Sequence, residues 1–563
     1  MGKQSLVALD TDHIKQYVFA TDKLKEIRGA SSILDNLNRR IMQQIADDKE
    51  FHATPVYTNG GAGLFLVDGD KEVAKKFGQR IQQAYNRETV GGASITFAVE
   101  EIPSNIQDAW NDDIWDTLEL LRYKLAKKKN IPPDISTLPS HPFLYLCDAC
   151  GTRYAERKDY DEARDEISRD RRYCEVCIAK RREDGKVKDG IDDIIKERKG
   201  TGEVKFSATH PFTWEKVIKF LSDDYIDSIP GGTERPPDFN ELRGIAGGKN
   251  YLALIYADGN AMGQLMSEFK SLAKIRETAE SIDDAVYEAM SDAISKHLKV
   301  VDTRTPPMFP FDILLIGGDD IMIVTSSSIA LDVARTIAVT FFEQTRGKGP
   351  NGKDCTISIS VVLAPVNYPF GLLQDLAQST LKFAKTSAAK NPPKTAYGDT
   401  VINFMTVTGS NSLNFNKVYD SLRKKTEDEK DPDFYATLRP YSVEELTELL
   451  NMIRQGKQRG LGRTKLHQLR EAVLRMNLTT SVSEALAVLN NWRGNQRELV
   501  VRQVYELAER YQQQYRDVEK PGTLFQRVTF PWFADGPDTY RSSLYDFCEL
   551  YDFVAQEEVE DAK

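Results

Sequence analysis

Residues 312–325 read DILLIGGDDIMIVT. Two apolar runs, residues 312–316 and 321–325, flank a four-residue turn with the sequence GGDD at positions 317–320. Apolar runs on either side of a short glycine-bearing turn are typical of a β-hairpin. The stretch therefore predicts two adjacent strands that present Asp319 and Asp320 at their connecting turn.

The segments on both sides of this hairpin extend it into a larger unit. Residues 251–257 (YLALIYA) form an apolar run that ends at Asp258, and alternate residues of 356–363 are apolar, which indicates a strand. The predicted order is strand 251–257, helix 261–298, the hairpin, helix 328–344, strand 356–363, helix 370–390 and strand 401–407. This βαββαβ order is that of the ferredoxin-like fold.

The first hundred residues repeat the same order. The predicted elements are strand 5–9, helix 22–46, strand 54–57, strand 63–67, helix 71–85 and strand 94–99. The first strand ends at Asp10, and the central turn, residues 59–62, reads NGGA and carries no carboxylate. The chain therefore has an internal duplication, in which only the second unit has acids at its central turn.

The sequence as a whole predicts an α+β protein with two ferredoxin-like (βαββαβ) palm domains, a zinc-binding insertion with four cysteine ligands, and a C-terminal helical domain. Ser442 and Glu445 fit a capping box ahead of an amphipathic helix in the last part. The expected domains are a first, degenerate palm at 1–102, a zinc-binding and helical insertion at 103–247, a second, catalytic palm at 248–409 and a helical domain at 410–563.

Three aspartates are the candidate catalytic residues. In a ferredoxin-like sheet the first strand lies beside the central hairpin, so Asp258 is expected to face Asp319 and Asp320. Carboxylate oxygens suit Mg²⁺ or Mn²⁺, and two such ions about 3.5–4 Å apart bind a triphosphate and activate an attacking hydroxyl. Each turn motif alone is a common turn signal, but their combination in this strand order predicts a two-metal site.

Nucleotide contacts are expected around these acids. Gly317 and Gly318 permit a tight turn that phosphate can approach closely. The amides of Gly259, Asn260, Ala261 and Met262, which lead into a helix, are candidates to hold the β- and γ-phosphates. Lys385 is a candidate contact to triphosphate oxygens, with Lys382 and Lys390 as competitors and a solvated helix face as the alternative.

Four of the six cysteines form two C-x-x-C pairs, Cys147 with Cys150 and Cys174 with Cys177. This spacing predicts a closed tetrahedral thiolate site for a structural Zn²⁺ ion. The sequence gives no support to a phosphate-loop nucleotide site or to a histidine metal site, because the chain has no GxxxxGK[ST] motif and its six histidines are scattered.

Net charge and hydropathy limit the partners and the cellular compartment that we expect for the protein. The net charge is −10, so any RNA contact is expected to be local or shared with partner subunits. A basic run at 457–475 is a candidate RNA or acidic-partner contact, but a solvated helix face explains it better. With no apolar stretch of about 18 residues and no secretory signal, we expect a cytoplasmic protein without membrane contact.

Taken together, these motifs resemble a known family. It is the large palm-domain polymerase/cyclase subunit of type III CRISPR-Cas effector complexes, in the form without an HD nuclease domain. The resemblance covers nearly the whole chain. It rests on YADGNAMG (256–263), LLIGGDDIMIV (314–324), AKTSAAK (384–390), the opening segment 6–37, the two C-x-x-C pairs and RPYSVEEL (439–446). The GGDEF diguanylate cyclases are similar more distantly.

The resemblance implies a function. Such subunits convert ATP into cyclic oligoadenylates when their complex, which contains a guide RNA, binds a target RNA. Asp258, Asp319 and Asp320 would hold two Mg²⁺ ions, Asp319 as the shared ligand and Asp320 as a ligand or proton acceptor. The first palm would contribute the acceptor side, with residues 28–31 as a candidate region.

Departures from the family and two other hypotheses remain. The family's DGD-type element reads Asp258-Gly259-Asn260 here, the first palm's turn lacks acids, and no HD-type domain is seen, so no DNase activity is expected. A non-catalytic scaffold subunit of an RNA-guided complex is one alternative. A stand-alone diguanylate-type cyclase is the other, although two palms in one chain weaken it.

Overall fold

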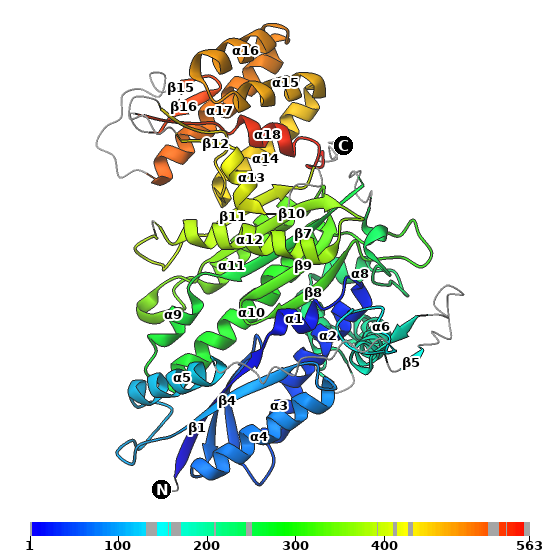
Figure 1. The fold of residues 1–563 in the computed structure, drawn as a ribbon, viewed down its shortest axis with the longest axis vertical. Helices are drawn as coiled ribbons and strands as arrows, with labels where there is room; N and C mark the ends of the chain where they lie inside the picture. The colour runs from blue at the N-terminus through cyan, green and yellow to red at the C-terminus, as the bar shows by residue number, and fades with distance from the viewer. Residues whose placement is uncertain are drawn as a thin grey trace.

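The computed structural model describes residues 3–130, 143–155, 157–158, 171–207, 210–243, 250–390, 392–408, 414–425, 432–515, 528–535 and 538–556. It is a mixed α+β structure that contains both palms, and this confirms the predicted fold class. In Figure 1 the first palm (blue) lies at one end, the second palm (green) in the middle and the C-terminal part (orange and red) at the other end. No helix among these residues has the length and apolar character needed to span a bilayer.

The first palm is a four-stranded antiparallel sheet in the order β2-β3-β1-β4. Its elements are β1 (Gln4–Asp12), α1 (Ile14–Val18), α2 (Leu24–Asn36), the π-helical turn η1 (Leu37–Ile41), α3 (Met42–Ala46), β2 (Ala53–Asn59), β3 (Ala62–Asp68), α4 (Lys71–Glu88) and β4 (Ser94–Glu101). This is the strand order of a ferredoxin-like fold, as the βαββαβ pattern predicts.

The insertion follows the first palm and is mainly helical. Its elements are α5 (Trp115–Lys129), β5 (Arg157–Lys158), β6 (Arg172–Tyr173), α6 (Glu175–Thr201), α7 (Phe212–Phe220), α8 (Asp223–Ser228) and η3 (Phe239–Leu242). The highly charged segment after Cys177 is part of the long helix α6, which packs against α2 of the first palm. Gly29 is required there, because a Cβ at this position would lie 1.7 Å from the Lys180 carbonyl oxygen.

The second palm is built on a six-stranded sheet in the order β14-β11-β10-β7-β9-β8. Its elements are β7 (Tyr251–Gly259), α9 (Met262–Ser267), α10 (Leu272–His297), β8 (Phe311–Gly317), β9 (Asp320–Ser326), α11 (Ala330–Thr345), η5 (Pro350–Gly352), β10 (Ile357–Pro365), α12 (Phe370–Ala388) and β11 (Val401–Thr406). The strand β14 (Tyr441–Ser442) comes from the predicted C-terminal domain and completes the sheet by pairing with β11.

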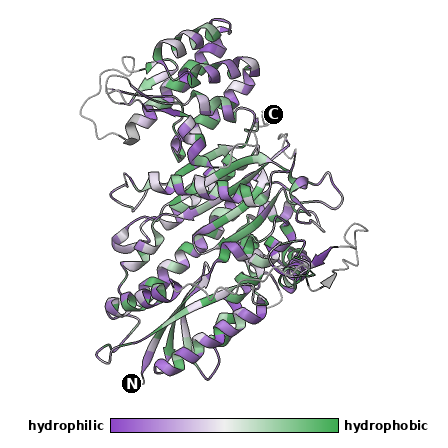
Figure 2. Cartoon of the chain, in the orientation of Figure 1, coloured by the Kyte–Doolittle hydropathy of each residue, from purple (hydrophilic) through white to green (hydrophobic). Residues whose placement is uncertain are grey.

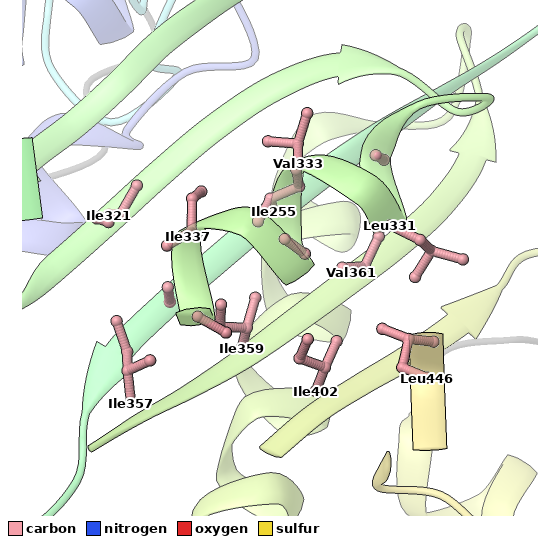
Figure 3. Close-up of a cluster of buried hydrophobic side chains, with 14 of the residues drawn as sticks. Ile255, Ile321, Leu331, Val333, Ile337, Ile357, Ile359, Val361, Ile402 and Leu446 are labelled. Carbon is pink, nitrogen blue, oxygen red and sulfur yellow. The ribbon is translucent and has the colours of Figure 1, made fainter. Parts of the chain in front are cut away.

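Both faces of the second-palm sheet are buried, and alternate residues of each strand pack into different clusters. On one face Ile255 and Ile359 pack with side chains of α11 such as Val333 and Ile337 (Figure 3). On the other face Leu254 and Val324 join a cluster that includes α12 and the first palm. Figure 2 accordingly shows these strands as largely hydrophobic. This shared core positions the first palm against the second palm, which carries the three candidate catalytic aspartates.

The C-terminal part contains helices and a small sheet in the order β12-β13-β17-β16-β15, which the sequence pattern did not predict. Its elements are α13 (Phe415–Ser421), β12 (Arg423–Lys424), β13 (Asp433–Tyr435), α14 (Val443–Gln458), α15 (Arg463–Leu474), α16 (Leu478–Asn490), α17 (Gly494–Tyr515), β15 (Val528–Thr529), β16 (Trp532–Ala534), β17 (Thr539–Arg541) and α18 (Leu544–Leu550). A buried hydrogen-bond network joins the C-terminal part to β14. In it, Asp546 accepts hydrogen bonds from Arg439 at 2.9 Å and from Tyr441 at 2.6 Å.

The predicted capping box is present at the start of α14. The Ser442 hydroxyl accepts a hydrogen bond from the Glu445 amide at 3.2 Å, and the Glu445 carboxylate accepts one from the Ser442 amide at 2.9 Å. We expect Ser442→Ala to lower the free energy of unfolding by about 1 kcal/mol, because an amide at the helix start loses its acceptor. Denaturant titration followed by circular dichroism measures this. Ser483→Ala, an exposed serine within a helix, is the matched control, and an equal loss in both variants would contradict the capping role.

Candidate active site

Two adjacent strands bring the three predicted aspartates together. Asp258 near the end of β7 lies directly opposite Asp320, the first residue of β9, in the antiparallel register of these strands. Asp319 precedes β9 in the hairpin turn, where Gly318 adopts a φ of +65°, a conformation that favours glycine. A Cβ on Gly259 would lie 2.8 Å from the Asp319 carboxylate, so that carboxylate approaches the backbone of β7 closely.

The carboxyl groups of this cluster lie close together although their negative charges repel one another. Burial, followed by the negative charges of Asp320 and Asp258, raises the pKa of Asp319 well above its ordinary value. Burial and the charge of Asp258 likewise raise the pKa of Asp320 to about 7. Asp320 Oδ1 is buried and has no hydrogen-bond partner in the described part of the chain. This donor set fits a divalent cation, which would offset the repulsion and engage the unsatisfied oxygen.

Lys385 on α12 supplies a positive charge at the same place. Its ammonium lies 2.6 Å from Asp258 Oδ2 and donates a hydrogen bond of 2.8 Å to the Gly259 carbonyl. Among the described residues the aspartates do not form a group whose ligand atoms all lie within 4.8 Å of one another. Lys385 therefore offsets part of the negative charge that Asp258 brings to the cluster.

The four residues after Asp258 have different roles in the fold. Asn260 is buried, and its side-chain amide bonds Thr356, Ser358 and the Asp399 carbonyl. Its backbone amide donates to the Thr356 carbonyl at 2.8 Å, so the described donors of Asn260 point into the protein. Ala261 has a φ of +52° and precedes the short helix α9, which begins at Met262. The predicted phosphate contacts of this segment stay a prediction.

The first palm repeats this geometry without the acids. Asp10 lies opposite Ala62, as Asp258 lies opposite Asp320. His13 before α1 also has a φ of +52°, matching Ala261 before α9. The first-palm residue that corresponds to Asp320 is therefore Ala62. The duplication extends to backbone conformation, and the predicted loss of acids from the first palm fits this register.

The two central turns touch each other. A Cβ built on Gly318 would lie 3.2 Å from the Gly60 Cα, and one built on Gly60 would lie 3.3 Å from the Gly318 Cα. Both glycines have positive φ, +58° for Gly60 and +65° for Gly318. The turn of the first palm therefore buttresses the turn that carries Asp319. Nothing in the local sequence around Gly60 indicates this contact.

A small cavity of about 100 Å³ lies at this junction. The residues that line it come from both palms and are Ile14, Lys15, Ser31, Leu34, Asp35, Asn38, Arg39, Gly60, Gly61, Leu315, Ile316, Gly317 and Asp320. The Lys15 ammonium lies 4.9 Å from the centre of the buried Tyr256 ring, and its charge acts to lower the pKa of Asp320. Sequence reasoning missed Lys15, because its proximity depends on how the palms pack.

The residues of the predicted acceptor region, 28–31, lie in two different environments. Ser31 lines the interpalm cavity, whereas Arg28 is buried and pairs with Asp312 at 2.6 Å and Asp184 at 2.9 Å. Gly29 packs against α6. Ser31 is therefore the residue of this region that is placed to contact a ligand beside the hairpin.

The four predicted zinc ligands do come together. The Sγ atoms of Cys147, Cys150, Cys174 and Cys177 all lie within 4.8 Å of one another. Cys147 and Cys150 belong to a turn before β5, while Cys174 and Cys177 lie at the start of α6. Four thiolates and no carboxylate or water position make a closed set that fits a structural Zn²⁺ ion.

We expect Cys174→Ser to lose about one equivalent of bound zinc per chain, because three remaining thiolates leave the tetrahedron incomplete. Atomic emission of the purified protein measures the metal. Cys548→Ala, a cysteine outside the quartet, is the control and should keep its zinc. Equal zinc content in both variants would exclude the quartet as the site.

Comparisons with known proteins agree with this fold. Residues 251–393 match the family described as Cas10/Cmr2, second palm domain. The solved structure "Crystal structure of Csm1-Csm4 cassette in complex with pppApApA" aligns with a TM-score of 0.53 at 13% identity, over 99% of this chain and 70% of that chain. The structure of a Csm1-Csm4 cassette in complex with cA4 aligns at 0.50 and 16%, over 84% of this chain.

At these identities the structural likeness concerns the fold. The chain spans 63% of the length of the cA4-bound relative. A comparison with curated proteins found no match.

Proposed function

We propose that this chain is a Cas10-like large subunit and acts as a nucleotidyl cyclase, because residues 251–393 match the second palm domain of the Cas10/Cmr2 family. The substrate would be ATP and the products cyclic oligoadenylate second messengers. The setting would be type III CRISPR antiviral defence. The observation that carries this proposal is the cluster of Asp258, Asp319 and Asp320 at facing ends of β7 and β9.

The carboxylates would hold two Mg²⁺ or Mn²⁺ ions, which neutralise triphosphate charge and acidify an attacking hydroxyl when bound. The raised pKa of Asp319 and of Asp320 supports this, since both reflect the burial of the carboxyl groups together with the negative charge of their neighbours. The unpartnered Asp320 Oδ1 supports it independently. Zn²⁺ in the cysteine quartet would have a structural role only.

In the proposed reaction the 3′-oxygen of one ATP bonds to the α-phosphorus of another, and pyrophosphate leaves. Lys385 would release Asp258 and turn to the triphosphate oxygens as the nucleotide binds. Gly317 and Gly318 have no side chains that would hold the phosphates away from the turn. Asp320 would act either as a ligand of these ions or as the acceptor of the 3′-hydroxyl proton.

The first palm would position the acceptor nucleotide. Lys15, Ser31 and Asn38 line the interpalm cavity beside Asp320 and offer an ammonium, a hydroxyl and an amide to a ribose or phosphate. The cavity of about 100 Å³ is smaller than a nucleotide pocket, for which about 300–1,000 Å³ is typical. It would therefore take only part of the acceptor, with the remainder outside. One palm would act as the catalyst and the other as its partner.

The setting would be a multi-subunit complex. Solved relatives are described as a Csm1-Csm4 cassette, one of them as part of a type III-A CRISPR-Csm interference complex. By analogy we propose that this chain assembles with other type III effector subunits, a guide RNA and a target RNA in the cytoplasm. Its net charge of −10 is consistent with RNA binding that depends on partners.

Synthesis from labelled nucleotides tests the proposal. Purified protein, with and without its partner subunits and a target RNA, is incubated with Mg²⁺ and labelled ATP or GTP. The products are separated and sequenced by nuclease digestion. We expect 3′–5′-linked adenylates, including cyclic ones, in the full mixture. No oligonucleotide under any condition would favour the scaffold alternative, and a product from GTP alone would favour a diguanylate-type cyclase.

A further inference from the structure

A larger cavity, of about 700 Å³, lies away from the hairpin where the first palm, the insertion and the segment before the second palm meet. Its walls come from the start of α2, from β6, from the middle of α6 and from residues 234–238. The elements α2 and α6 lie beside each other in Figure 1. This volume is in the range of small-molecule sites.

The lining is strongly basic in a chain whose net charge is −10. The basic residues are Lys23, Lys25, Arg28, Arg171, Arg181, Arg182, Lys188 and Arg235. The acidic ones are Glu26, Asp184, Glu234 and Asp238, and Arg28 also pairs with Asp312 outside the lining, so the cavity has an excess of about three positive charges. Such a local excess attracts anions against the overall charge of the protein.

The floor of the cavity is preorganised. Arg28 and Arg235 are 7% and 8% exposed, and both pair with the Asp184 carboxylate, at 2.9 and 2.7 Å. Arg235 Nε is buried and has no hydrogen-bond partner in the described part of the chain. A buried guanidinium with a spare donor is the kind of group that binds an anionic oxygen strongly. This distinguishes the cavity from a solvated basic surface.

The rim carries further positive charge for the same ligand. Lys23, Arg171 and Arg182 are exposed, and among the described residues their side chains have no ion pair or hydrogen bond. Lys188 pairs with Glu234 at 3.1 Å, and Arg181 lies 3.6 Å from Glu26. Three cations at the entrance are therefore available to a bound anion without breaking a pair that the described part of the chain forms.

We propose that this cavity binds a small polyphosphate, the di- or triphosphate group of a nucleotide or inorganic pyrophosphate. A compact anion with three or four negative charges matches the excess of positive charge, and a volume of about 700 Å³ leaves room for the rest of a nucleotide. A nucleic-acid strand fits less well, because single-strand sites offer open aromatic platforms to the bases. The aromatic side chain in the lining is Tyr173, which is 3% exposed and is covered by Arg181 at 4.5 Å.

The test measures binding separately from catalysis. Full-length protein carrying Asp319→Ala and Asp320→Ala is titrated calorimetrically with inorganic pyrophosphate in the absence of Mg²⁺, so that no metal ion at the hairpin can hold the phosphate. We expect one bound pyrophosphate per chain. Adding Lys23→Glu with Arg182→Glu should weaken the binding roughly tenfold or more, because two charge-assisted contacts become repulsive. ATP, triphosphate and a 12-nucleotide RNA are titrated in parallel to identify the source of the phosphate.

The matched control is Lys49→Glu with Lys76→Glu, two exposed lysines outside the cavity that change the net charge equally. Its affinity should stay within about twofold of the parent, since distant exposed charges are largely screened. Lys23→Gln with Arg182→Gln serves if the reversed variant does not fold. The proposal is overturned by an absence of pyrophosphate binding, by equal affinity in the cavity and control variants, or by binding of the RNA alone.

Discussion

Replacing Asp319 and Asp320 together with alanine is expected to abolish nucleotide synthesis, lowering the rate by roughly 10³-fold or more. The two carboxylates lie at the hairpin beside Asp258, and no other acidic residue takes part in the register of β7 and β9. Without them, the charge of the triphosphate and of the leaving pyrophosphate is no longer offset. Product formation from labelled ATP in the assembled complex measures the rate.

The same double variant should remain folded. Folding raises the pKa of both aspartates, so their ionisation opposes folding increasingly as the pH rises above the ordinary aspartate pKa. Removing them should leave the thermal midpoint at neutral pH unchanged or higher. Asp10→Ala, the equivalent carboxylate of the first palm, is the matched control and should retain synthesis. Loss of activity in Asp10→Ala together with full activity in the double variant would reverse the assignment of the palms.

Placing a methyl group between the two turns is expected to have the next largest effect on synthesis. In Gly60→Ala the new Cβ would lie 3.3 Å from the Gly318 Cα and 3.4 Å from the Gly317 carbonyl oxygen. The contact is made with backbone atoms, so no side chain can rotate to relieve it. The catalytic turn must shift by a few tenths of an ångström, and since a displacement of about 1 Å costs about 10²-fold in rate, we expect a loss of roughly severalfold. Steady-state synthesis by the variant in the assembled complex measures this.

Gly460→Ala separates this effect from simple backbone strain. Gly460 also has a positive φ, +66°, but no atom of the described residues lies within 4 Å of a Cβ built on it. Both variants should lose about 1 kcal/mol of stability, which is the cost of a left-handed alanine. Only Gly60→Ala should slow synthesis. Equal activity in the two variants would show that the first-palm turn does not position Asp319.

The features that sequence reasoning predicted are those with local signals. Strand alternation and the glycine-flanked turn give the hairpin, C-x-x-C spacing gives the cysteine quartet, and Ser442 with Glu445 gives the capping box. The pairing of Asp258 with the hairpin follows from strand order alone. Each of these depends on residues close in sequence or on a topology rule.

The features that the sequence did not predict depend on how distant segments pack. The approach of Gly60 to Gly318, the influence of Lys15 on Asp320 and the burial of Arg28 each join parts of the chain far apart in sequence. Asn260 reads as a ligand-loop residue but bonds to Thr356 and Ser358 at the start of β10. Short strands such as β14 have too few residues to show a period.

Metal binding at the hairpin tests the central claim most directly. Mn²⁺ is titrated into the purified protein with a non-hydrolysable ATP analogue, and bound ions are counted by electron paramagnetic resonance. The account predicts two bound Mn²⁺ ions per chain, and none in the variant with Asp319→Ala and Asp320→Ala. Equal Mn²⁺ binding by both proteins would contradict a metal centre built on Asp258, Asp319 and Asp320.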